Sequence, residues 1–252
     1  MLLKNLNLVL YRSAAELKSE ATRTYAGYLW WILDPLLSLG VYYVAFNYIF
    51  HRKTEHFAVF LFSGIVVYRF FSGTVVRGAG SIIAGHSLMY YMYFHKILFP
   101  LSVVVVNLIK FLITLLLVIA VVWISGFRPT WSYLALPFLI GLVVLISTGV
   151  SLVCAALTPF FPDFQLLLST ILHLLIFLSG VFYEISKLTP RMQSIIRLNP
   201  LAVLIEQIRG ILLYGQWPNL IFLLPGLLVS ILLIVLGWWL IHKFNRYYPK
   251  LR

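Results

Sequence analysis

The chain has 252 residues, of which 62% are hydrophobic and only 10% are charged. Because this is far more apolar side chain than one soluble core can bury, the composition excludes a soluble globular domain and indicates a polytopic membrane protein. The formal net charge is +12, but the cations flank apolar segments instead of forming one basic face, a pattern that favours anionic lipid headgroups and argues against nucleic acid as a partner.

The first segment, residues 1–27, predicts an amphipathic helix that lies along the membrane surface. Apolar residues recur at three- and four-residue spacing on one face, while charged residues occupy the rest of the helix. Aromatic residues that include Tyr28 and Trp31 follow, at the depth expected for an interfacial belt. Asp34-Pro35 then starts a regular helix that enters the bilayer.

Six apolar runs separated by polar or proline-containing connections predict an all-α fold with six transmembrane helices in a single permease domain. The predicted spans cover residues 28–50, 57–76, 101–125, 131–158, 166–182 and 220–241. Residues 28–182 therefore hold the first five spans, and residues 220–252 hold the sixth span and a tail.

An even number of spans places both termini on one side of the membrane. Of the lysines and arginines, ten fall on that side and seven on the other, while Arg69 and Lys110 lie within spans. The positive-inside rule therefore predicts that both termini are cytoplasmic.

Residues 77–100 form the one internal connection that combines cations, glycines and a cluster of aromatic side chains. The segment is too polar to sit in lipid and long enough to fold. It predicts a short cytoplasmic helix between the second and third spans.

On the opposite side, residues 183–219 contain two amphipathic stretches that meet at Asn199-Pro200. Neither stretch is long enough to span, so together they predict an external re-entrant helical hairpin that packs against protein. Glu206 and Arg209 are spaced to pair on its polar side, either as an ordinary solvated pair or as part of a gate.

Motifs for catalysis are absent from the sequence. It contains no Walker-type phosphate loop, no His-Glu-x-x-His pair, no second cysteine beside Cys154 and no acidic cluster within the predicted spans. The chain is therefore expected to hold no metal and no cofactor of its own, and not to be an enzyme by itself.

Arg69 and Lys110 are cations inside predicted spans, where burying a charge is costly enough to indicate a function. Arg69 is expected to face a cavity and to meet an anionic phosphate of a cargo. The alternative is that both side chains snorkel to an interface or pair with backbone carbonyls. The aromatic residues near span ends serve either as belt anchors or as a lining on which sugars stack.

Several segments resemble the type-2 ABC exporter permeases that move polysaccharides such as O-antigen, capsule and teichoic acid. They run nearly end to end and are Tyr25-Ala26-Gly27-Tyr28-Leu29-Trp30-Trp31-Ile32-Leu33-Asp34-Pro35-Leu36, Phe62-Ser63-Gly64-Ile65 with Tyr68 and Phe71, Lys96-Ile97-Leu98-Phe99-Pro100, Leu198-Asn199-Pro200, Ile208-Arg209-Gly210-Ile211-Leu212 and Gly215-Gln216-Trp217-Pro218. The chain departs from the family pattern at Pro162-Asp163, where an Arg-Asp pair is common.

The resemblance implies a half-transporter in a bacterial inner membrane. Two copies would form a channel for a lipid-linked polysaccharide, and two copies of a separate ATPase subunit, which bind ATP and Mg, would dock beneath and move the cytoplasmic coupling helix. The residues expected to meet the ATPase are Ser81, Ile82, His86, Ser87, Met89 and Tyr90. The residues expected along the substrate path are Arg23, Tyr28, Trp31, Tyr68, Arg69, Phe71 and Arg77, and those expected at an external gate are Asn199, Pro200, Glu206 and Arg209.

Two other functions fit the sequence. One is an ABC-type permease for drug or lipid efflux, and the other is a membrane-embedded enzyme or scaffold without an ATPase partner. A companion ATPase with a sugar-binding domain would argue against the first, and a pull-down that lacks any ATPase would favour the second.

Overall fold

The computed structural model describes the backbone of residues 2–45, 56–86, 95–161 and 163–248, and the side chains of these ranges from residue 7 onward. Within this part of the chain the regular structure is helical, without strands, which confirms the predicted all-α class. The α-helices are α1 (Leu2–Thr22), α2 (Trp30–Val44), α3 (Phe57–Ala79), α4 (Ser81–Ala84), α6 (Leu98–Ile124), α7 (Leu136–Leu157), α8 (Phe164–Leu175), α9 (Pro190–Arg197), α10 (Pro200–Tyr214) and α11 (Leu220–Lys243).

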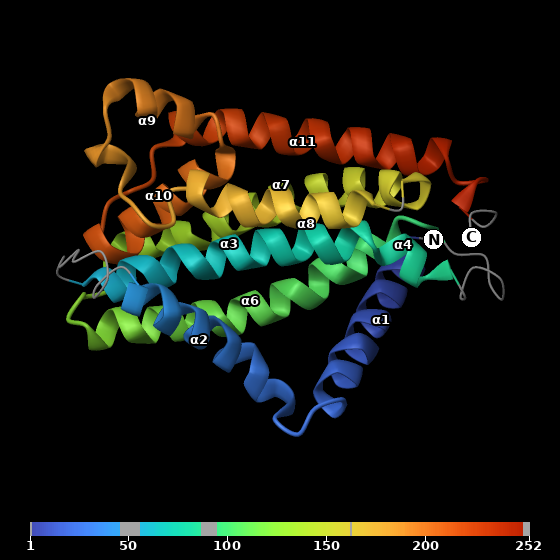
Figure 1. Ribbon diagram of the computed structural model, residues 1–252, viewed down its shortest axis with the longest axis horizontal. Coiled ribbons are helices and arrows are strands. Elements are labelled where there is room, and N and C mark those ends of the chain that lie inside the picture. Colours follow the sequence, from blue (N-terminus) through green and yellow to red (C-terminus); the bar gives the residue numbers. More distant parts are fainter. Residues whose placement is uncertain (1, 46–55, 87–94, 162, 249–252) are drawn as a thin grey trace.

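Among the residues that the structure describes, four helical segments are long and apolar enough to cross a membrane. They are Phe57–Ala79, Leu98–Ile124, Trp131–Phe160, which is α7 with short 3-10 turns at both ends, and Leu220–Lys243. These four lie roughly side by side along the long axis of the molecule (Figure 1). The chain is therefore a multi-pass membrane protein, as predicted.

The other two predicted spans are shorter in the described structure. The first corresponds to the 15 residues of α2, and residues 46–50 of that prediction lie outside the described residues. The fifth corresponds to α8 and one 3-10 turn, Ile176–Leu178, which ends before the predicted residue 182. The chain turns back there because Gly180 adopts a positive φ of 67°, a conformation that is costly for residues with a Cβ. The count of six spans thus stays a prediction.

α3 is the central helix of the bundle. It contacts α2, α6, α7, α8 and α10, and most of its side chains are buried. α11, by contrast, keeps most of its apolar side chains exposed, as expected for a helix that faces lipid.

α11 is held against α7 by close backbone approach. A Cβ at Gly237 would lie 2.6 Å from Cβ of Leu152, and a Cβ at Gly149 would lie 2.9 Å from Cβ of Leu233. Small residues at such positions allow membrane helices to pack closely, because van der Waals contact replaces the hydrophobic driving force that lipid removes.

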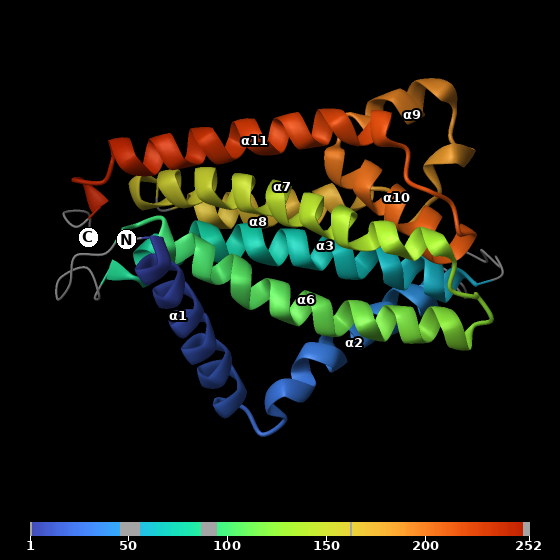
Figure 2. The ribbon, with the colours of Figure 1, turned by 180° about the vertical axis from the view of Figure 1, so that it is seen from behind.

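α1 and α2 form a V that projects from the bundle (Figures 1 and 2). α1 is a helix, as predicted, and its start lies beside α4, at the end of the bundle where α11 also ends. It is tied to α6 through Ser13, whose hydroxyl is 3.1 Å from the carbonyl oxygen of Ser102, and through Arg12, whose guanidinium lies 4.3 Å from the centre of the Phe99 ring.

α9 and α10 lie at the opposite end of the bundle (Figure 1). The predicted division into two short helices at Asn199-Pro200 is confirmed, and the side chain of Asn199 caps α10 by accepting a hydrogen bond from the backbone N–H of Leu201 at 3.0 Å. The segment predicted to couple and the segment predicted to gate therefore occupy opposite ends of the molecule.

Candidate substrate-path site

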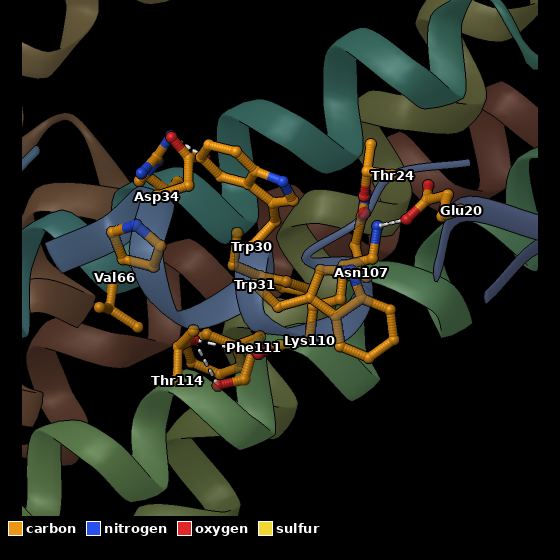
Figure 3. Close-up of a pocket in the computed structure, with 14 residues that line it drawn as sticks. Glu20, Thr24, Trp30, Trp31, Asp34, Val66, Asn107, Lys110, Phe111 and Thr114 are labelled. Atoms are coloured by element: carbon orange, nitrogen blue, oxygen red, sulfur yellow. Dashed lines mark hydrogen bonds and ion pairs between the residues drawn. The ribbon is translucent and has the colours of Figure 1, made fainter. Parts of the chain in front are cut away.

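A cavity of about 430 Å³ lies inside the V, between α1, α2, α3 and α6 (Figure 3). Its charged and amide-bearing lining residues are Glu20, Asp34, Arg69, Asn107 and Lys110. Its aromatic lining residues are Trp30, Trp31, Phe70 and Phe111. Polar groups, charges and flat rings thus meet in one space beside the membrane-spanning helices.

Arg69 lines this cavity, as the sequence predicted, but its guanidinium is already paired. Nη2 is 2.5 Å from a carboxylate oxygen of Asp34, and Nη1 donates to the hydroxyl of Ser38 at 3.1 Å. Both acceptors belong to α2, so the charge of Arg69 joins one arm of the V to the central helix α3.

Glu20 joins the other arm to the bundle. Its carboxylate accepts hydrogen bonds from Lys110 of α6 (Figure 3) and from Arg77 of α3, and Arg77 also donates to the carboxylate of Glu16 at 2.7 Å. Arg77 further approaches the side-chain oxygen of Asn107 at 3.4 Å. Two acidic residues of α1 therefore hold two cations of the membrane helices.

These contacts differ from both roles expected for Arg69 and Lys110 if they do not face cargo, which were to snorkel to an interface or to pair with backbone carbonyls. Arg69 and Lys110 neither reach only for an interface nor rely on backbone carbonyls, because each pairs with a carboxylate from the V. The sequence could not reveal this pairing, since the partners of Lys110 and Arg69 are 90 and 35 residues away. The available signal was the spacing of Glu16 and Glu20, which places both on one side of a helix.

The pKa of Glu20 is lowered from its usual value. Desolvation by burial acts in the opposite direction and raises it, but the hydrogen bond from Lys110 and the positive charges of Arg77 and Lys110 outweigh that effect. Glu20 is therefore ionised at neutral pH. The cluster contains three carboxylates, Glu16, Glu20 and Asp34, and three cations, Arg69, Arg77 and Lys110, so its formal charges cancel.

The aromatic residues of the cavity are arranged around the same charges. The ammonium of Lys110 lies 5.4 Å from the centre of the Trp31 ring, and Tyr28 packs edge-on against Trp31 at 4.8 Å. Trp30 remains about half exposed. Aromatic faces beside paired charges suit a ligand that carries both an anionic group and a weakly apolar ring face.

The structure brings only some of the predicted substrate-path residues together. Trp31 and Arg69 line the cavity, while Tyr28 and Arg77 contact its lining residues. Arg23 is exposed in the turn after α1. Tyr68 and Phe71 are buried on α3 and do not line this cavity, and the hydroxyl of Tyr68 donates to the carbonyl oxygen of Leu172 in α8 instead.

The predicted coupling segment is partly described. Ser87, Met89 and Tyr90 lie outside the described residues. Ser81 and Ile82 are buried, with the hydroxyl of Ser81 donating to the carbonyl oxygen of Gly78 at 2.6 Å, and His86 is half-buried. The side chains that α4 exposes are those of Ile83 and Ala84, which were not among the residues predicted to meet the ATPase.

At the other end, the predicted pair between Glu206 and Arg209 is wrong. Glu206 pairs instead with Arg197 of α9 at 3.2 Å. Arg209 lies on the apolar face of α10, where Ile205, Ile208 and Leu212 are also buried, so its side chain points into the protein.

Arg209 is 4% exposed, and its guanidinium donates to backbone carbonyl oxygens of two other segments of the chain. It donates to Phe60 of α3 at 3.1 Å, to Gly180 at 2.6 Å and to Val181 at 2.7 Å, and it lies 3.6 Å from the centre of the Phe60 ring. A Cβ at Gly64 would fall 2.2 Å from Nη2 of Arg209, so the glycine makes room for the guanidinium. No group of three or more metal-binding side chains occurs among the described residues.

Comparison with known proteins gives one family over most of the chain. The profile of the ABC-2 type transporter family matches residues 14–213. The chain is 28% identical to the O-antigen export system permease protein RfbA of Myxococcus xanthus over 221 residues, which cover 87% of this chain and 85% of that protein. It is 27% identical to RfbA of Klebsiella pneumoniae over 201 residues, covering 79% and 78%. It is 26% identical to the polysialic acid transport protein KpsM of Escherichia coli over 203 residues, covering 79% of each chain.

Proposed function

Because the chain belongs to the ABC-2 type transporter family, we propose that it is the permease subunit of an exporter for a lipid-linked polysaccharide. The observation that carries the proposal is that relatives named for two different glycans, O-antigen and polysialic acid, each align with at least 79% of this chain. A likeness of that extent favours the same class of cargo over drug or lipid efflux, and over an enzyme or scaffold.

The proposal includes a separate ATPase subunit that binds ATP and Mg. The absence of a phosphate loop from the sequence supports a partner that supplies the energy. We assign its docking surface to the end of the bundle that carries α4, where Ile83 is exposed. Two permease copies with six spans each, in a bacterial inner membrane and with cytoplasmic termini, complete the assembly.

The cavity inside the V is proposed to receive the phosphate groups of the lipid carrier. Arg69 and Lys110 reach it from two membrane helices, but Asp34 and Glu20 now hold them. A phosphate that enters would replace these carboxylates, so its binding would release the contacts of the V with Arg69 and Lys110, while those of Arg77 with Glu16 remain. The sugar rings that follow would pass over Trp30 and Trp31.

The test is to delete the gene in its host and to complement the deletion with wild type, with Arg69→Gln/Lys110→Gln, or with Lys187→Gln. Lys187 is a matched control because it is an exposed cation far along the chain from the cavity, paired with Glu184 at 2.9 Å. Surface polysaccharide and intracellular lipid-linked polysaccharide are quantified with a glycan-specific antibody.

Deletion is expected to abolish the surface polymer and to accumulate the lipid-linked form inside the cell. The cavity double variant is expected to lower surface polymer about tenfold, while the control keeps it. Unchanged surface polymer after deletion overturns the proposed function. Loss on deletion with full activity of the double variant overturns only the role given to the cavity.

A further inference from the structure

A second cavity, of about 400 Å³, lies apart from the one inside the V. It forms where α1, the start of α6 and the end of α11 meet, at the end of the bundle shared by the beginning of α1 and the end of α11 (Figure 2). Its apolar wall includes Val9 of α1, Leu98 and Leu101 of α6, and Trp238 and Ile241 of α11.

The polar side of this cavity is basic. His95, Lys96 and His242 line it together with the amide of Asn245, and none of its lining residues is acidic. This differs from the cavity inside the V, where carboxylates and cations alternate. Lys96 is 7% exposed, so a cationic side chain is held within the protein at this point.

The cavity lies at the ends of two helices long enough to span a membrane, where lipid headgroups are expected. α6 begins and α11 ends here, and both are long enough to span a membrane. Trp238 and Trp239 are about half exposed, and the ammonium of Lys243 lies 4.6 Å from the centre of the Trp239 ring. Tryptophan and lysine at the end of a span are typical of the membrane–water interface.

The exposed face of α11 leads from the cavity toward the middle of the bilayer. Ile231, Leu232 and Val235 are exposed on α11 in the turns before Trp238, which lines the cavity, and this apolar surface suits acyl chains. A basic pocket between membrane helices that continues into an apolar face is complementary to a molecule with an anionic head and hydrocarbon tails.

We propose that this cavity is a binding site for an anionic glycerophospholipid, with its phosphate at Lys96 and His242 and its acyl chains along α11. Lys96 supplies a fixed charge, and the imidazole groups donate hydrogen bonds to phosphate oxygens. The lipid would fill the junction between α1, the start of α6 and the end of α11. The inference depends on the chain being a membrane protein and not on the identity of the cargo.

The experiment is native mass spectrometry of the full-length protein in detergent. The protein is titrated with phosphatidylglycerol or with phosphatidylcholine of the same acyl chains, and a further arm adds sn-glycerol 1-phosphate as a competitor. The test variant is Lys96→Gln/His242→Gln. Its matched control is Lys187→Gln/His173→Gln, which removes the same residue types at sites that line neither cavity. His242→Glu provides a second variant at an exposed position, where misfolding is not expected.

Wild type and the control are expected to bind phosphatidylglycerol about tenfold more tightly than phosphatidylcholine. The test variant and His242→Glu are expected to lose at least about fivefold of that preference. Equal binding of the two lipids, or an equal loss in the control, overturns the inference. Competition by sn-glycerol 1-phosphate at the same concentration as the lipid would instead identify a soluble phosphate as the ligand. Displacement of the lipid by an added ATPase subunit would identify the cavity as a protein interface.

Discussion

Glu20 is the residue at which the V and the membrane helices are joined most directly. One carboxylate accepts hydrogen bonds from Lys110 and Arg77, which belong to different helices. Charge-assisted hydrogen bonds of this kind are stronger than neutral ones, and removing one partner leaves the others poorly satisfied. Glu20 therefore helps to fix the position of α1, together with the contacts of Glu16 and Ser13.

Glu20→Gln is expected to weaken the docking of α1 by about 1–3 kcal/mol, because the amide keeps one acceptor but loses the charge. Spin labels at Lys18→Cys on α1 and Leu116→Cys on α6, both exposed positions, measure the docking as a distance distribution. The distribution should broaden in Glu20→Gln. Ser19→Ala, an exposed change one residue away, is the control and should leave it narrow. Identical distributions in all three proteins would rule out the anchoring role.

Arg209 serves the opposite end of the molecule. Its guanidinium joins α10 to α3 and to the turn at Gly180 through three carbonyl oxygens. Lysine carries the same charge but lacks the planar fork, so it cannot occupy all three acceptors at once.

Arg209→Lys is expected to lower the free energy of unfolding by about 2–4 kcal/mol, because two buried carbonyls lose a charged donor. Thermal unfolding of the detergent-purified protein should show the difference. Arg191→Lys is the matched control at an exposed position of α9 and should leave the midpoint unchanged. An unchanged midpoint of thermal unfolding in Arg209→Lys would show that the planar guanidinium is not required for stability.

At the scale of the elements, the seam between α7 and α11 depends on size and not on charge. The positions of Gly149 and Gly237 leave no room for a Cβ, whereas Gly141 of α7 has no neighbouring atom within 4 Å of the place where a Cβ would lie. Comparing a substitution at Gly237 with the same substitution at Gly141 therefore separates an effect on helix packing from an effect on local helix propensity.

Gly237→Val is expected to force α11 away from α7, since the added side chain meets Leu152 and the backbone of Val153. Overpacking of this kind costs about 1–3 kcal/mol or more. Gly141→Val should be tolerated. Yield and monodispersity after detergent extraction compare the two variants. Equal behaviour of both would contradict close packing at this seam.

The sequence predicted the positions of the helices more accurately than the side-chain contacts between them. Length and hydropathy alone were enough for α3, α6, α7 and α11, because lipid demands a long apolar helix. The fifth span was predicted to be too long, because hydropathy does not detect the local turn at Gly180, where φ is positive. Asn199 was recognised as the junction of two helices because Asn-Pro is a strong helix boundary.

The sequence predicted which cations belong to the candidate site, but not which carboxylates pair with them. The rule that intramembrane cations are functional pointed to Arg69 and Lys110, and both line the cavity. Their carboxylate partners depend on where α1 and α2 fold back, which no local pattern encodes. Arg209 was misassigned to Glu206 because a spacing of three residues shows that two side chains can meet, but not which of them faces the core.

The whole molecule separates two tasks by distance. The end with α4 is the one proposed to receive the ATPase, and the end with α9 and α10 holds the buried Arg209 (Figure 1). α4 itself exposes Ile83 and buries Ile82, so neighbouring residues give opposite expectations for a docked partner.

A cysteine at Ile83 is expected to form a crosslink with the ATPase subunit in membranes, and a cysteine at Ile82 is not. Cys154 is buried and should not interfere. Crosslinked species are detected by non-reducing gel electrophoresis and identified by mass spectrometry. The absence of crosslinks from both variants would place the partner on another surface.

α1 extends over 21 residues from the neighbourhood of α4 to the carboxylate of Glu20. At 1.5 Å per residue it is a stiff rod of about 30 Å. On the proposed function, a displacement of its first turn by the ATPase would reach the ammonium of Lys110 with little loss. Work done by nucleotide hydrolysis at one pole of the protein would thus alter the local electric field within the membrane, through a single continuous helix.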